Sequence, residues 1–159
     1  MNTEALMSAT ERLAALGLTL PPPTALAGNF VPFRVAGNLL LLSGAGPRMA
    51  DGKLMTGKIG AMLSVGHGYE AAKVCGLNLL ANMAEAAGTL DRVDSVLRVF
   101  GMVLSAENFA EQAKVLDGCI DLFVAVFGEL GRPARSAVGV SSMPRNISVQ
   151  VEATVLLRN

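Results

Sequence analysis

The sequence predicts an α+β protein in which two long helices cover one face of a largely antiparallel sheet, with an extra helix at the N-terminus. Hydrophobic residues recur at three- and four-residue steps in three segments, which predicts helices. In the last segment they alternate with polar residues, which predicts a strand with one buried face. The expected order is helix 3–17, strands 30–35 and 39–42, a loop over 45–67, helix 68–87, strand 92–104, helix 106–127, and strands 135–140 and 147–157.

The first 27 residues are predicted to be an appendage of a single domain that spans residues 1–159. Thr3 can cap the first helix and Gly17 can end it. Three prolines at 21–23 then require an extended chain, which we expect to be a solvated linker.

The long loop over 45–67 suggests a functional or interface role, because loops of this length are uncommon inside compact domains. His67, at its end, is the only histidine. A metal site built on several histidines is therefore excluded, and catalysis by a Ser–His or Cys–His pair would have to use this one residue.

Composition limits the possible partners. Hydrophobic residues make up 52% of the 159 residues and charged residues only 16%, against about 25% in typical domains. So little charge suggests that part of the surface is buried in a symmetric homo-oligomer. Thirteen basic and thirteen acidic residues cancel, which argues against nucleic-acid binding.

The chain is also expected to be soluble and cytoplasmic. No run approaches the ~18 apolar residues that span a bilayer, so no membrane association is expected. The N-terminus does not have the pattern of a signal peptide. Cys75 and Cys119 both fall in helical patterns, where they are expected to be free core thiols.

The last two strands contain a candidate ligand site. If they form an antiparallel pair joined by a turn at 141–146, and the valines of the first face the core, Arg135 shares a face with Gln150. Ala137 and Gly139 would leave room beside the guanidinium, which could then hold a small carboxylate. The alternative is an ordinary ion pair of Arg135 at a strand end.

Several motifs resemble the RidA-like (YjgF) reactive-intermediate deaminases. They are AGNLLLLSG at 36–44, AGTLDRV at 87–93, FGE at 127–129, PARS at 133–136, Met143-Pro144, and VEA at 151–153. The resemblance covers nearly everything after Gly28, and the preceding helix and proline linker resemble a longer-chain branch of the family. It implies a chorismate-mutase-like fold and a homotrimer with three clefts between subunits. It also implies hydrolysis of 2-imino or enamino acids to 2-oxo acids and ammonia, without metal or organic cofactor.

The resemblance also implies roles for individual residues. Arg135 matches the arginine that binds the substrate carboxylate. Ser43 and Gly44 match positions near the floor of the cleft. Phe30 falls where many active relatives carry tyrosine; it can form a wall of the pocket but offers no hydroxyl. Asp117 occupies a position where relatives often have asparagine.

Gln150 is the largest departure from the family pattern. It replaces the first glutamate of a pair whose second member matches Glu152, and in active relatives that first acid orients or deprotonates water. Glutamine can position water but cannot usefully accept its proton at neutral pH. Two hypotheses therefore remain: a deaminase that is slow or altered in substrate choice, and a non-catalytic trimeric protein that binds small carboxylate metabolites. Ribonuclease activity has no support, because the net charge is zero and there is no histidine pair.

Overall fold

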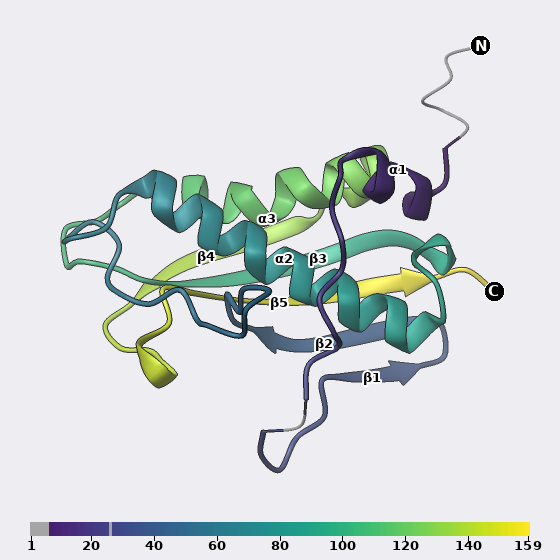
Figure 1. Ribbon diagram of the computed structural model, residues 1–159, viewed down its shortest axis with the longest axis horizontal. Helices are drawn as coiled ribbons and strands as arrows, with labels where there is room; N and C mark the ends of the chain where they lie inside the picture. The colour runs from purple at the N-terminus through teal and green to yellow at the C-terminus, as the bar shows by residue number, and fades with distance from the viewer. Residues whose placement is uncertain (1–6, 26) are drawn as a thin grey trace.

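The computed structural model describes residues 7–25 and 27–159 and has the predicted order of helices and strands (Figure 1). Five strands form one sheet in the order β1-β2-β5-β3-β4, and α2 and α3 pack together over one face. The predicted two-layer α+β class is confirmed. The main elements are α1 (Ala9–Ala15), β1 (Phe33–Ala36), β2 (Leu39–Ala45), α2 (Val65–Ala87), β3 (Val93–Leu104), α3 (Gln112–Phe127), β4 (Ala134–Val140) and β5 (Val149–Leu157). Short 3-10 turns follow at Leu90–Arg92, Gly128–Gly131 and Pro144–Asn146.

The alternation predicted for β5 is confirmed, and it explains the central place of this strand. Its odd-numbered residues are buried against the helices, whereas its even-numbered residues face away from them. β5 pairs antiparallel with β2 on one side and with β3 on the other. The core therefore lies between this side of the sheet and the two long helices.

The predicted pairing of the last two strands is wrong. β4 does not pair with β5; it lies parallel to β3 at the edge of the sheet. The residues of β4 are mostly exposed or half-buried, so this strand suits an edge, whereas β5 has the buried alternation of an inner strand. The turn after β4 therefore leads the chain past β3 to reach the position of β5.

The boundaries of both long helices differ from the prediction. α2 begins at Val65, where the Ser64 hydroxyl caps it by accepting a hydrogen bond from the His67 N–H at 3.2 Å. His67 therefore lies in the first turn of the helix and not in the preceding loop. α3 begins only at Gln112, because the backbone of Ala106 instead donates a hydrogen bond of 2.8 Å to the carbonyl of Ile59. This bond ties the 45–67 loop to the end of β3.

The N-terminal segment is held against the rest of the chain. α1 is capped by Ser8, whose side chain forms a capping box with Glu11; the predicted cap, Thr3, lies outside the described residues. Gly17 follows the helix with φ +67°, as expected for a helix stop. The proline run has no regular secondary structure, and Pro22 and Pro23 are exposed, as expected for a solvated linker. Directly after it, Thr24 forms hydrogen bonds of 2.9 and 3.1 Å with the buried amide of Asn82, which hold the end of the linker against α2.

Cys75 and Cys119 are buried free thiols, as predicted, and burial raises the pKa of both. Among the residues that the structure describes, no helix has the length and apolar character needed to cross a membrane.

Candidate functional site

Arg135 lies on the helix-covered face of the sheet, which corrects the face predicted from the sequence. It is opposite Val99 of β3, whereas Gln150 of β5 is opposite Met102 of the same strand. Val99 is buried in the core, and side chains three residues along a strand point to the other face. Arg135 and Gln150 therefore point to opposite faces of one sheet. The prediction failed because it assumed that β4 and β5 are neighbours.

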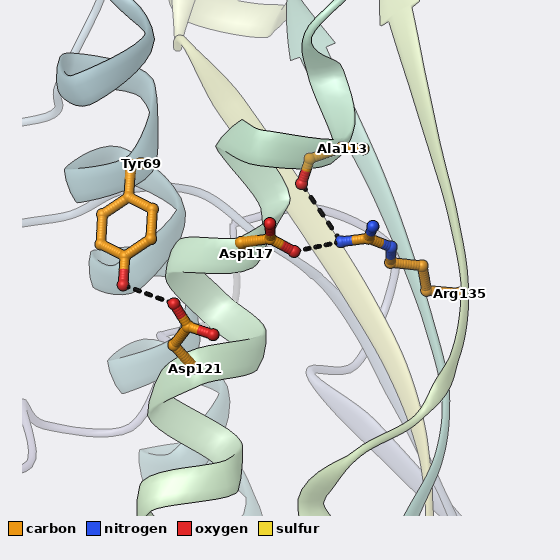
Figure 2. A network of polar contacts seen from close by, with 5 residues as sticks. All are labelled: Tyr69, Ala113, Asp117, Asp121 and Arg135. Atoms are coloured by element: carbon orange, nitrogen blue, oxygen red, sulfur yellow. Dashed lines mark hydrogen bonds and ion pairs between the residues drawn. The ribbon is translucent and has the colours of Figure 1, made fainter.

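Arg135 reaches from β4 to α3 (Figure 2). Its Nη1 donates to Oδ1 of Asp117 at 2.5 Å and to the carbonyl of Ala113 at 3.1 Å. The side chains of Arg135 and Asp117 are 30% and 44% exposed. The ion pair that we considered as the alternative is thus present. It uses one nitrogen of the guanidinium, and within the described part of the chain no group binds Nε or Nη2.

A hollow of about 570 Å³ also lies between β4 and the beginning of α3. Gly139 lines it, and a Cβ there would lie 2.6 Å from the Ser105 hydroxyl oxygen and 2.8 Å from the Gln112 side-chain nitrogen. Gln112, which lines the same hollow, precedes Ala113, the residue whose carbonyl binds Arg135. Ala137 shares the helix-covered face with Arg135 and packs against the core. The hollow therefore adjoins Gly139 and not Arg135, which does not line it. Room for a ligand beside the guanidinium stays a prediction.

Ser43, Gly44 and Gln150 form a second group, where β2 bulges away from β5. Gln150 Nε2 donates to the carbonyl of Gly44 at 3.4 Å, and a Cβ at Gly44 would lie 2.8 Å from the Gln150 side chain. Glycine is therefore required for Gln150 to lie across β2. The Ser43 hydroxyl donates to the carbonyl of Val31 at 2.7 Å, and Phe30, next in the chain, is half-exposed.

The uncovered face carries charges that the sequence analysis did not assign to a site. Arg34, Arg98 and Glu152 line a hollow of about 300 Å³ together with Ser43. None of the three charged residues forms an ion pair with any residue that the structure describes. Arg98 stands between apolar neighbours in β3, Leu97 and Val99, which was the available signal. Asp117 had no such signal as a partner of Arg135, because strand order had to be known first.

Tyr69 and His67 lie on α2, and neither belongs to the Arg135 group or the Gln150 group described above. The Tyr69 hydroxyl donates a hydrogen bond of 2.7 Å to Oδ2 of Asp121 (Figure 2). Asp121 lies one helical turn after Asp117 on α3. This hydrogen bond, burial and the neighbouring carboxylates raise the pKa of Tyr69 to about 12. His67 is exposed, and its ring has no polar partner among the described residues.

The fold and these groups define a two-layer α+β protein with an arginine–aspartate pair at the sheet edge and a polar group on the uncovered face. The model of the family described as "YjgF/chorismate_mutase-like, putative endoribonuclease" matches residues 10–155. The chain belongs to this family, and the chorismate-mutase-like fold expected from the sequence is confirmed.

Three proteins illustrate how closely the chain follows its relatives. Protein TCP17 of Trypanosoma cruzi is 43% identical over 148 residues, which are 92% of either chain. The protein Atu1372 of Agrobacterium tumefaciens, described as having unknown function, is 40% identical, with a TM-score of 0.86 over 95% of this chain and 94% of that one. A structure from Shewanella oneidensis described as a putative endoribonuclease is 35% identical, with a TM-score of 0.91 over 95% and 100% of the two chains.

Proposed function

We propose that this protein hydrolyses reactive 2-imino or enamino acids to 2-oxo acids and ammonia, as the RidA-like members of its family are expected to do. The observation that carries the proposal is the free edge of the Arg135 guanidinium. Nε and Nη2 present two parallel N–H donors, the geometry that a carboxylate accepts in a bidentate manner. The side chain is partly exposed, so a small ligand can reach it.

The proposed reaction needs a held carboxylate and a positioned water. Arg135 holds the carboxylate, and water adds to the C=N carbon while the nitrogen takes up a proton. The tetrahedral adduct then loses ammonia, so that imino acid and water give 2-oxo acid and ammonia. The Gln150 side-chain oxygen can accept a hydrogen bond from the water, but the water must lose its proton to solvent or to the substrate nitrogen.

Arg135 and Gln150 can serve one site only if two subunits form it. Within one chain they point to opposite faces of the sheet. The uncovered face also carries exposed hydrophobic side chains, among them Leu39 and Leu41. These facts support a homotrimer in which the uncovered face of one subunit meets the Arg135 edge of the next.

The first experiment measures 2-oxo acid release from an imino acid generated by an amino-acid oxidase. The wild-type protein should accelerate release, and Arg135→Ala should remove the acceleration. Equal rates with and without wild-type protein would reject the proposal.

A mixing experiment tests the shared site. Arg135→Ala and Gln150→Ala should each be inactive as homotrimers. When they are refolded together in equal amounts, roughly a quarter of the sites receive both wild-type residues, and activity should return to that extent. Failure of the mixed trimers to regain activity would show that the two residues do not share a site.

A second candidate, a non-catalytic trimer that binds small carboxylates, is favoured by Gln150 itself. It predicts thermal stabilisation by such ligands that disappears in Arg135→Ala, with no turnover of imino acids. Ribonuclease activity, the activity in the family's description, has less support here. The chain has zero net charge, and its single histidine is exposed without a catalytic partner among the described residues.

A further inference from the structure

We propose that the hollow between β4 and the beginning of α3 is a binding site for a small oxyanion, a carboxylate or a phosphate group. The site is separate from the Arg135 guanidinium, which does not line this hollow. The inference therefore goes beyond the proposed function and does not depend on hydrolysis of imino acids.

The first observation is a buried hydroxyl without a partner. Ser105 follows β3 directly and is only 8% exposed. Its Oγ forms no hydrogen bond with any residue that the structure describes. Ser105 lines the hollow, so a ligand can reach this hydroxyl. Because a buried polar group without a hydrogen bond is costly, we expect a group that binds it to occupy the hollow.

Gly139 on β4 lets a second donor lie beside this hydroxyl. A Cβ at Gly139 would lie 2.6 Å from Ser105 Oγ and 2.8 Å from Gln112 Nε2, so both atoms lie close to one point over the strand. Gln112 Nε2 donates one proton to the carbonyl of Phe109 at 2.8 Å, and its second proton has no acceptor among the described residues. One ligand oxygen can therefore accept from the Ser105 hydroxyl and from the Gln112 amide.

The end of α3 at the hollow favours a negative charge. Glu111, at the N-cap position, makes no capping hydrogen bond, and the first turn contains no acidic residue. The N–H groups of residues 112–114 bind no acceptor within the part of the chain that the structure describes. The positive end of this helix is therefore open where Gln112 lines the hollow.

Lys58 adds a cation from the 45–67 loop. Ile59, the next residue, is fully buried and bridges to Ser105, which places Lys58 beside the hollow. Glu107 lines the hollow as well, and neither Lys58 nor Glu107 forms an ion pair with a described residue. Their opposite charges offset each other, so the helix end and the two neutral donors determine the preference for an anion.

The test titrates the full-length protein with acetate, with its neutral counterpart acetamide and with inorganic phosphate, at constant pH and ionic strength. Acetate and phosphate should shift the backbone amide NMR signals of Ser105, Gln112 and Gly139. Acetamide should bind about tenfold more weakly, because it lacks the charge. A lower Kd for phosphate would assign the site to phosphate groups, and a lower Kd for acetate would assign it to carboxylates. Equal binding of acetamide and acetate would overturn the inference.

Three substitutions inside the hollow test the donors. Gly139→Ala places a methyl group against the Ser105 hydroxyl and the Gln112 amide, which are movable ends of side chains. The fold should be retained, as the amide spectrum will show, and anion affinity should fall about tenfold. Ser105→Ala should lower the affinity about fivefold, the effect of one hydrogen bond. Lys58→Ala should lower it about threefold, because that ammonium is exposed.

Two variants outside the hollow are the controls. Lys53→Ala removes a lysine from the same loop, one that is paired with Asp51 at 3.7 Å, and should leave anion affinity within about twofold of wild type. Arg135→Ala should do the same. If Arg135→Ala removes the shifts, the anion binds at the arginine and the inference is wrong. If Gly139→Ala and Ser105→Ala both leave the affinity unchanged, the inference is also wrong, and the proposed function is unaffected.

Discussion

At the residue scale, Gln150 decides whether the proposed site can work as a fast catalyst. Gln150→Glu supplies the carboxylate that can accept a proton from water, and general-base assistance is worth roughly 10²–10⁴-fold. We expect kcat for imino acid hydrolysis to rise by about 10²-fold. The variant also loses the hydrogen bond from Nε2 to the Gly44 carbonyl, which should cost about 1 kcal/mol of stability.

Asn38→Asp is the control, since it makes the same change from amide to carboxylate at an exposed turn between β1 and β2. The Asn38 carbonyl accepts a hydrogen bond from the N–H of Leu157, seven residues along β5 from Gln150. This variant should change kcat by less than about threefold, a remote-charge effect. A Gln150→Glu protein with wild-type kcat, in which Arg135→Ala still abolishes activity, would show that the missing acid is not what limits the rate.

Tyr69 provides a direct check on the packing of α2 against α3. It is the single tyrosine and there is no tryptophan, so phenolate absorbance reports this one group. Its pKa is raised to about 12 from 10.0, first by the hydrogen bond to Asp121. The folded state then keeps a proton that the unfolded state loses, so the free energy of unfolding falls as pH rises from about 10 to about 12.

Asp121→Asn should move the phenolate titration back towards 10, and Tyr69→Phe should remove this contribution to the slope of stability against pH. A titration midpoint near 10 in the folded wild-type protein would contradict the hydrogen bond.

The sequence identified Arg135 as a candidate ligand-binding residue but not its environment. The sequence shows that Arg135 is a single cation at the start of an apolar strand. It does not show which face of the sheet the Arg135 side chain occupies, because side-chain alternation on β4 can be assigned to a face only relative to a partner strand, and that partner is β3. The Asp117 contact follows from that pairing and was missed for the same reason.

At the element scale, hydrophobic periodicity predicted which segments are helices and strands, but it did not predict which strands are neighbours in the sheet. The alternation of β5 reports one buried face, and the stripes of the helices report the side that packs. Neither pattern says which strand lies beside which. Both long helices begin at residues other than those predicted, because caps and loop contacts determine where a helix begins. The Ser64 cap starts α2 before the predicted residue, and the hydrogen bond between Ala106 and Ile59 makes α3 start after it.

Close contact of α2 and α3 depends on Gly118. A Cβ at this position would lie 2.0 Å from the carbonyl oxygen of Tyr69, a backbone atom that cannot move without its helix. Gly118→Ala should therefore lower the free energy of unfolding by about 3 kcal/mol, at the upper end of the typical cost of overpacking. Chemical denaturation measures the change.

Gly66→Ala is the matched control within α2. The nearest atom to its added Cβ, the Ser64 Oγ, is 3.7 Å away, and alanine favours a helix over glycine. It should raise stability by about 0.5 kcal/mol. Equal effects of the two substitutions would mean that the helices are further apart than the structure has them.

At the scale of the whole molecule, a single chain leaves one face of its sheet uncovered. The helices cover one face of the sheet, and the other face joins apolar side chains to the hollow that contains Arg34, Arg98 and Glu152. A chain with 16% charged residues has little polar surface with which to cover that face. The proposed homotrimer covers this face with a neighbouring subunit and places Gln150 of one subunit near Arg135 of another. We therefore expect a variant that does not assemble to be inactive.

Leu41→Arg tests this coupling. Leu41 is 46% exposed on the uncovered face of β2, opposite Arg34 of β1, and it lines the same hollow as Arg34 and Arg98. Burial of a leucine in an interface is worth about 1.5–3 kcal/mol, and an arginine there would add several kcal/mol for a buried charge beside two like charges. Native mass spectrometry should show a shift from trimer to monomer, and deaminase activity should fall with the fraction of trimer.

Met62→Arg, at a methionine that is 96% exposed in the 45–67 loop, should leave the oligomeric state and the activity unchanged. A Leu41→Arg protein that remains a trimer would place the interface elsewhere, and the Arg135 site would then have to act without Gln150.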